Sequence, residues 1–255
     1  MQSTGRLIAL VTAALLAACQ NPGEAPSSQG AEAMSADPPS STSTAQAVGA
    51  TEAATTEPGI TPIVALDSIG ATKEFLERTL GESTYETPDE ARYTVDGCDV
   101  SVGFHDRAVS MISIDLQEGC RFDVSGLMGT QSDVVIDGPL TFGEFEQLFG
   151  EADYRAPCLA SCGNAYDPYV DAVVGGSRAN GVIDVSAHSV FVNDSVIQAA
   201  NEWRDELTAE RGEDYVFETQ FNCTREHNAV ARRIFARIEV HSLQFGRELG
   251  TYECG

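Results

Sequence analysis

The sequence predicts an α+β fold in which duplicated helix-plus-antiparallel-hairpin units form an antiparallel sheet, packed by helices and stabilised by disulfides. Three observations lead to this expectation: a helical segment that occurs twice, alternating strand patterns after each copy, and paired cysteines in a chain that looks exported. The expected organisation is a signal peptide at 1–18, a tether at 19–62, tandem repeats at 63–192, and a C-terminal helix with strands at 193–255 that packs on the repeats.

The N-terminus has the pattern of an exported lipoprotein. Arg6 precedes an apolar stretch, 7–18, that is too short to span a bilayer as a stable helix and is typical of a signal peptide. The sequence LAAC at 16–19 resembles the lipobox of bacterial lipoproteins. The resemblance implies that Cys19 carries acyl chains, palmitate among them, and becomes the membrane anchor. An ordinary secretory signal or a buried N-terminal helix is the alternative. Because Gln20 rather than Asp follows the cysteine, the resemblance implies the outer membrane, on its periplasmic side.

Composition limits the partners. Residues 20–62 are rich in Ser, Thr, Ala and Pro and contain no aromatic residue, which predicts a flexible tether. The chain has 15 basic and 39 acidic residues, a formal net charge of −24. Nucleic acid and anionic lipid surfaces are therefore poor partners, whereas a protein with a basic surface is favoured.

Six cysteines besides Cys19 predict disulfides in an oxidising compartment. They are Cys98, Cys120, Cys158, Cys162, Cys223 and Cys254. Their order favours pairing Cys98 with Cys120, Cys158 with Cys162 and Cys223 with Cys254, because each pair closes a local loop, but sequence alone does not choose the pairing. Zinc bound by Cys158, Cys162 and a histidine is the competing interpretation.

One helical segment occurs twice. Thr72–Pro88 and Thr141–Pro157 align without a gap at a shift of 69 residues. The identical pairs are Thr72 and Thr141, Glu77 and Glu146, Gly81 and Gly150, Glu82 and Glu151, Tyr85 and Tyr154, and Pro88 and Pro157. A threonine that caps the first turn, apolar residues at helical spacing and a closing glycine predict a short helix in each copy.

Strand patterns follow each helix. Alternating residues predict strands at 91–95, 98–105 and 107–116 after the first helix, and at 167–174 and 182–192 after the second. Polar turns separate the strands within each group. The two helix-hairpin repeats are therefore expected at about 63–125 and about 126–192.

This repeated pattern resembles the small outer-membrane assembly lipoprotein fold, the SmpA/OmlA type, and its tandem relative, the β-lactamase inhibitory protein. The resemblance covers about 63–192 and rests on the short helix that starts at threonine and ends in Leu-Gly or Phe-Gly. These relatives are binding proteins: one is a scaffold in a membrane complex and the other inhibits a secreted enzyme. The resemblance therefore implies an architecture and a tendency to bind protein, and it assigns no site.

The C-terminal region begins with the clearest helix in the chain, 193–212, which runs from an Asn-Asp cap to a glycine. Its apolar stripe is Val196, Ile197, Ala200, Trp203 and Leu207, with the tryptophan expected in the core. Residues 214–223 are expected to form a strand. Residues 226–245 fit a helix or a strand, and a short helix that gives way to a strand near Arg237 is favoured.

No catalytic motif is present, and the four histidines share none. We therefore expect no catalytic residue, no cofactor and no metal, and a non-catalytic protein-binding module such as an inhibitor or immunity protein for a secreted enzyme. A structural subunit of an envelope assembly complex and an enzyme with an unrecognised site are the alternatives. An interface is expected on the sheet face away from the helices and at two turns. The turn residues are His105, Asp106, Arg107, Ser177, Arg178 and Asn180.

Overall fold

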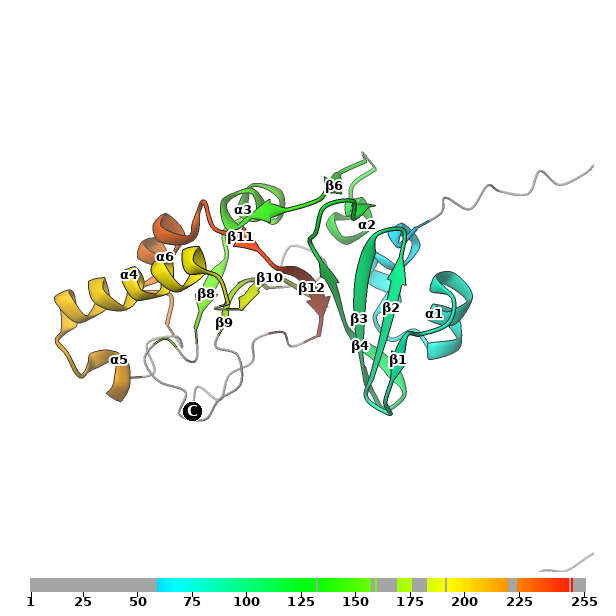
Figure 1. Ribbon diagram of the computed structural model, residues 1–255, viewed down its shortest axis with the longest axis horizontal. Helices are drawn as coiled ribbons and strands as arrows, with labels where there is room; N and C mark the ends of the chain where they lie inside the picture. Colours follow the sequence, from blue (N-terminus) through cyan, green and yellow to red (C-terminus); the bar gives the residue numbers. More distant parts are fainter. Residues whose placement is uncertain are drawn as a thin grey trace, which may run out of the picture. The chain divides into compact units, whose positions relative to one another are not determined.

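A computed structural model describes residues 59–131, 133–156, 159, 169–175, 183–190, 192–219, 224–247 and 249 (Figure 1). All of them belong to one compact unit, Ala54–Gly255. The expected signal peptide and the anchor residue Cys19 lie outside the described residues. Ile60 is buried in the core, so the folded unit includes residues that the sequence analysis assigned to the end of the tether.

An antiparallel sheet of eight strands organises the unit, in the order β1-β2-β3-β4-β12-β10-β9-β8. The strands are β1 Tyr85–Glu86, β2 Glu90–Val95, β3 Cys98–His105, β4 Ala108–Asp115, β8 Asp153–Arg155, β9 Tyr169–Val174, β10 Asp184–Val190 and β12 Ser242–Gly246. All neighbouring strands run antiparallel. The expected α+β class with an antiparallel sheet is confirmed.

The two faces of the sheet can be read from the register, because directly paired residues share a face and successive residues alternate. One row of paired residues is apolar and buried across seven strands: Tyr93, Val100, Ile114, Leu243, Ala187, Ala172 and Tyr154. The neighbouring row on the opposite face is mostly polar: Tyr85, Arg92, Ser101, Ser113, Gln244, Ser186, Val173 and Asp153. We call the face that carries the second row the polar face.

Helices pack against the apolar face. The longer ones are α1 Lys73–Leu80, α3 Phe142–Phe149, α4 Asp194–Arg211 and α6 Asn228–Phe235, and the short ones are η1 Thr61–Ile63, η2 Leu66–Ser68, α2 Ser125–Met128 and α5 Tyr215–Glu218. Phe235 of α6 lies at the centre of an aromatic cluster, with ring-centroid distances of 5.7 Å to Phe142, 5.9 Å to Trp203 and 6.1 Å to Tyr154. The cluster joins α3, α4 and α6 to β8, and it confirms that Trp203 is a core residue.

The two expected helices of the repeated segment are both present. Thr141 forms a full capping box with Glu144, whereas the side chain of Thr72 makes no capping hydrogen bond. Gly81 and Gly150 end their helices with φ values of 88° and 101°, which favour glycine. The two copies differ in where their aligned tyrosines, Tyr85 and Tyr154, lie in the sheet.

Tyr85 and Tyr154, which align in the two copies, lie on opposite faces of the sheet. Tyr85 pairs with Arg92 on the polar face and is 50% exposed, whereas Tyr154 pairs with Ala172 on the apolar face and is 2% exposed. Identity in the alignment therefore marks equivalent helices and not equivalent strand positions.

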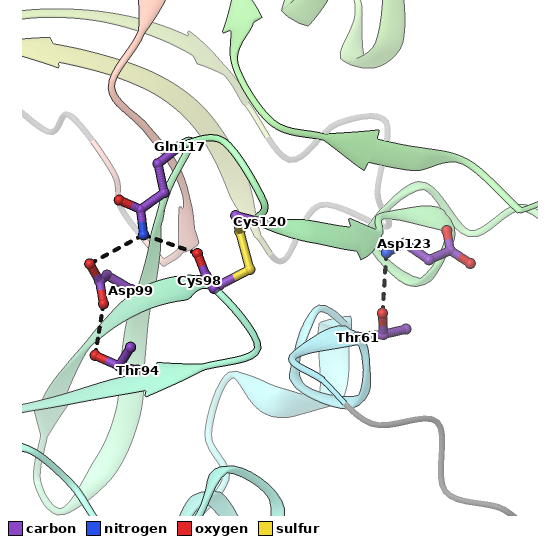
Figure 2. The surroundings of a disulfide bond; sticks show 8 residues. Thr61, Thr94, Cys98, Asp99, Gln117, Cys120 and Asp123 are labelled. Carbon is purple, nitrogen blue, oxygen red and sulfur yellow. Dashed lines mark hydrogen bonds between the residues drawn. A yellow bond between two sulfur atoms is a disulfide. The ribbon is translucent and has the colours of Figure 1, made fainter.

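The hairpins of β2, β3 and β4 are pinned by a disulfide between Cys98 and Cys120, as the sequence analysis expected (Figure 2). The side-chain amide of Gln117 donates to the carbonyl of Gly97 at 3.0 Å and to Asp99 at 3.3 Å (Figure 2). A Cβ at Gly97 would lie 2.9 Å from the carbonyl oxygen of Gly119, so the close approach of these two turns requires glycine. The other expected cysteine pairs lie outside the described residues.

The C-terminal region differs from expectation in two places. α4 has the expected start and end, but Ile197 of its expected stripe is exposed and Ala199 is buried instead. The strand expected at 214–223 is wrong at its start, because Tyr215–Glu218 form the helix α5. For 226–245, the favoured helix-to-strand change is confirmed by α6, β11 Glu239–Val240 and β12.

Two small sheets complete the described elements. β5 Arg121–Asp123 pairs with β6 Val135–Asp137, and β7 Leu140–Thr141 pairs with β11. The second of these brings the chain from α6 back to the main sheet, where β12 enters between β4 and β10. The sequence did not predict that a C-terminal strand joins the two groups of strands.

Candidate functional site

The tip of the β3–β4 hairpin carries the expected turn residues His105, Asp106 and Arg107. The side chains of His105 and Asp106 are 84% and 93% exposed, with 3.6 Å between His105 Nε2 and Asp106 Oδ2. Asp106 and Arg107 have φ values of 51° and 66°. The tip is therefore an exposed turn whose two central residues are both left-handed.

Left-handed backbone is costly for residues other than glycine, by roughly 1–2 kcal/mol each, and two-residue hairpin turns of this kind usually contain Asn-Gly or Asp-Gly. The β2–β3 turn of the same sheet follows that rule with Asp96 and Gly97. An arginine in the second position at Arg107 places a long cationic side chain on the tip at a conformational cost. Strain of this kind is common where a side chain has a function.

The other expected turn residues, Ser177, Arg178 and Asn180, lie outside the described residues. Of the two turns expected at the interface, the structure therefore describes only the one at His105–Arg107.

The polar face offers a contact surface at its β1–β2 end. The guanidinium of Arg92 lies over the ring of Tyr85, with 5.2 Å to the ring centroid, and its Nε donates to Glu90 at 2.6 Å. Tyr85 and Arg92 are both exposed, whereas Ser113 and Ser186, further along the same row, are buried. An exposed tyrosine and arginine held against each other are typical of residues that dominate binding energy at interfaces.

A hydrogen-bonded pair that the sequence analysis missed lies further along the polar face. His188 Nδ1 is 2.7 Å from Asp171 Oδ1 on the neighbouring strand, and both side chains are largely buried. An ionised Asp171 accepts the Nδ1 proton, which leaves Nε2 of His188 as the basic nitrogen. Ser242 is directly opposite His188 on the other side. The three residues form no sequence motif, because they are brought together by the pairing of strands and not by their spacing along the chain.

His188 and Asp171 are arranged as a base and the carboxylate that orients it, but no nucleophile in the described part of the chain is hydrogen-bonded to the base. Among the residues that the structure describes, no hydrogen bond joins Ser242 to His188, and Ser242 is only 4% exposed. A hydroxyl needs to reach about 2.6–3.2 Å from the base for nucleophilic catalysis, although this distance is often longer in structures without substrate.

A cavity of about 370 Å³ lies between α6 and the end of β9. Its charged residues pair with one another: Arg225 lies 3.0 Å from Asp153, and Arg232 lies 2.9 Å from Glu151. Asn228 donates to Asp153 at 2.8 Å. These internal pairs satisfy the charges of the cavity and give no indication of a ligand.

The described part of the chain offers neither a metal site nor a membrane-spanning helix. It contains no group of three or more His, Cys, Asp or Glu side chains that could hold a metal ion. None of its helices combines the length and the apolar character that crossing a membrane requires. Cys158 and Cys162, the residues of the competing zinc interpretation, lie outside these ranges.

Comparison with known proteins gives no match: no family model, no curated protein and no solved structure is similar to this chain.

Proposed function

We propose that the protein is a lipid-anchored periplasmic lipoprotein of the outer membrane whose folded unit binds another protein without catalysis. The signal-peptide pattern, the LAAC sequence that ends at Cys19, and Gln20 after it support the anchor and the location. The composition of residues 20–62 supports a tether that gives the folded unit reach. An inhibitor or immunity role toward a secreted enzyme fits best, with a structural subunit of an envelope assembly complex as the alternative.

The observation that carries this proposal is the strained hairpin tip. Asp106 and Arg107 keep left-handed backbone although a glycine at the second position would relieve strain, and their side chains point into solvent. Asp106 is a usual residue for the first position, but among the described residues no side-chain hydrogen bond or ion pair accounts for an arginine at the second position. A partner that binds Arg107 accounts for it, because arginine is enriched among residues that dominate binding energy.

The charge of the chain supports a partner with a basic surface. A formal net charge of −24 steers basic proteins toward the unit and repels nucleic acid. The cationic side chain of Arg107 then orients the complex, since it has to contact an acidic or aromatic side chain on an otherwise basic partner.

The finer architecture is also a proposal. We infer that the sheet derives from two related helix-hairpin units, as in the tandem relatives that the sequence resembles. The order of strands supports this inference, because β1–β4 and β8–β10 lie on either side of β12, and each group follows an eight-residue helix that ends in glycine. The opposite faces of Tyr85 and Tyr154 limit the likeness to the helices and strand order.

The proposal is tested by recovery of the partner with and without the strained tip. The full-length chain, tagged and expressed in the envelope of a two-membrane bacterium, is cross-linked and purified, and retained proteins are identified by mass spectrometry. The double variant Asp106→Asn/Arg107→Gly creates the preferred Asn-Gly turn. We expect an unchanged or higher melting temperature and about a tenfold or greater loss of partner, as for removal of a strong interface residue.

Asp96→Asn in the β2–β3 turn is the matched control and should retain the partner. A single basic hydrolase in the eluate supports the inhibitor role, and membrane-assembly components support the scaffold. Equal recovery with the Asn-Gly tip contradicts the role of Arg107, and an empty eluate contradicts protein binding altogether.

A second candidate function is favoured by the Asp171–His188 pair with Ser242 opposite it. If these residues catalyse acyl transfer, Ser242 Oγ should displace fluoride from a fluorophosphonate probe while His188 takes its proton. Labelling of the full-length chain should then be lost in Ser242→Ala and in His188→Ala and kept in Ser113→Ala. An unlabelled wild-type chain under conditions that label a known serine hydrolase rules this function out.

A further inference from the structure

His241 lies where β10, β12 and the start of α4 meet. Its main-chain amide donates to the carbonyl of His188 at 2.9 Å and to Ser189 Oγ at 3.1 Å. Its own carbonyl accepts from the amide of Leu116 at 2.8 Å. The backbone of this residue is therefore held on both sides, and its half-buried ring is the part that can respond to a change in conditions.

The hydrogen bonding of the ring is set by the main chain. The amide of Val190 donates to His241 Nδ1 at 3.0 Å, and because an amide can only donate, Nδ1 must be unprotonated. The neutral ring therefore carries its hydrogen on Nε2. Asn193 Nδ2 lies 3.3 Å from Nε2 and is also a donor, so with this tautomer the two nitrogens touch without a hydrogen bond. Asn193 Oδ1 accepts from the amide of Val196 at 2.9 Å and so caps α4. An uncharged ring thus sits between the end of β10 and the cap of α4.

The surroundings oppose a charge on this ring. Burial lowers the pKa of His241 most, and the neighbouring His188 lowers it further, whereas Asp115 at the end of β4 and Glu239 on β11 raise it. The net effect lowers its pKa from 6.5. Asp171 is hydrogen-bonded to His188 at 2.7 Å. Burial and Asp99 raise the pKa of Asp115 and so weaken it as a counter-charge in acid.

We propose that His241 is an acid-sensitive latch that holds the end of β10 when its ring is neutral and releases it when the ring is protonated. Protonation places a hydrogen on Nδ1, opposite the amide hydrogen of Val190. Two donors then face each other across a distance that suited a hydrogen bond, so the ring has to leave Val190. The cap of α4, in which Asn193 Oδ1 accepts from the amide of Val196, does not involve the ring.

The direction of the pH dependence follows from linkage. A histidine whose pKa is lower in the folded chain binds its proton more readily in the unfolded chain. The stabilisation by His241 is therefore complete above about pH 6.5 and is lost as the pH falls from there through the folded-state pKa.

Hydrogen exchange of the full-length chain tests the latch. Peptides that contain Val190 are followed at about pH 8 and about pH 5 by mass spectrometry, with correction for the intrinsic exchange rate. We expect a several-fold loss of protection in acid for the wild type. His241→Asn retains a side-chain acceptor near the place of Nδ1 and cannot be protonated, so its protection should not depend on pH. His105→Asn removes an exposed histidine at the hairpin tip and should keep the wild-type response.

Nuclear magnetic resonance of the wild-type ring provides an independent measurement if His241→Asn does not fold. Protonation of His241 and the change in the Val190 amide signal should occur at the same pH. The latch is contradicted by unchanged protection at Val190 when the ring is protonated, by a ring that stays neutral until the chain unfolds in acid, or by a folded His241→Asn that keeps the wild-type pH response.

Discussion

Glu77 and Glu146 are identical residues of the two repeated helices, but their surroundings differ. Both carboxylate oxygens of Glu146 accept from Arg232 Nε at 2.9 Å, one also accepts from the amide of Ala152 at 2.9 Å, and the side chain is 11% exposed. Glu77 is 42% exposed and lies 3.2 Å from Lys73 one turn away. The contribution of a single residue to stability therefore depends on which side chains of other elements contact it, and not on its position in its own helix.

We predict that Glu146→Gln lowers the free energy of unfolding by about 2 kcal/mol, because it removes the partner of a partly buried guanidinium. The aligned control Glu77→Gln should cost less than about 0.5 kcal/mol, as for an exposed pair. Urea denaturation of both variants measures the difference. Equal losses in the two variants would show that Arg232 finds sufficient compensation in Glu151.

At the scale of elements, the disulfide of Cys98 with Cys120 ties the start of β3 to the chain that leaves β4. It closes a loop with a sequence separation of 22 residues. β2, β3 and β4 thereby become a unit that is fixed at one end, while the strained tip with His105 and Arg107 lies at the other end (Figure 1). A contact at the tip is thus carried by strands that have little freedom to adjust.

The double variant Cys98→Ala/Cys120→Ala should lower the free energy of unfolding by about 3 kcal/mol, the usual effect of a crosslink that closes a loop of this length. Chemical denaturation without reductant measures this loss and leaves the remaining cysteines in their native state. A loss below about 1 kcal/mol would mean that the Gly97–Gly119 approach and the Gln117 hydrogen bonds already hold the two turns together.

Elements with local signals were predictable, and those with competing signals were not. The capped helices α3 and α4 and the alternating strands β3 and β4 carry their pattern within one segment. α5 lies in the segment 214–223, which was expected to form a strand. In the fold, the hydroxyl of Tyr215 lies 2.8 Å from Nε2 of His227, the residue before α6, and Val216 is buried. Packing of α5 against α4 and this contact therefore override the local preference for a strand.

At the scale of the whole molecule, the sheet is completed by pairings between distant segments. Leu243 of β12 pairs with Ile114 of β4 on one side and with Ala187 of β10 on the other. The same pairings place Ser242 beside His188, and the pairing of β10 with β9 places His188 beside Asp171. None of these neighbours is close in sequence, which is why neither the central strand nor the buried polar pair could be read from spacing.

The central position of β12 has a consequence for how the protein is made. β4 and β10 have no common neighbour until residues 242–246 have been synthesised. A chain translated only in part would present two unpaired strand edges, and such edges recruit other chains. The sheet therefore closes only after the whole of the folded unit has been made, and a truncated product should be cleared or aggregate and not persist as a weaker version of the protein.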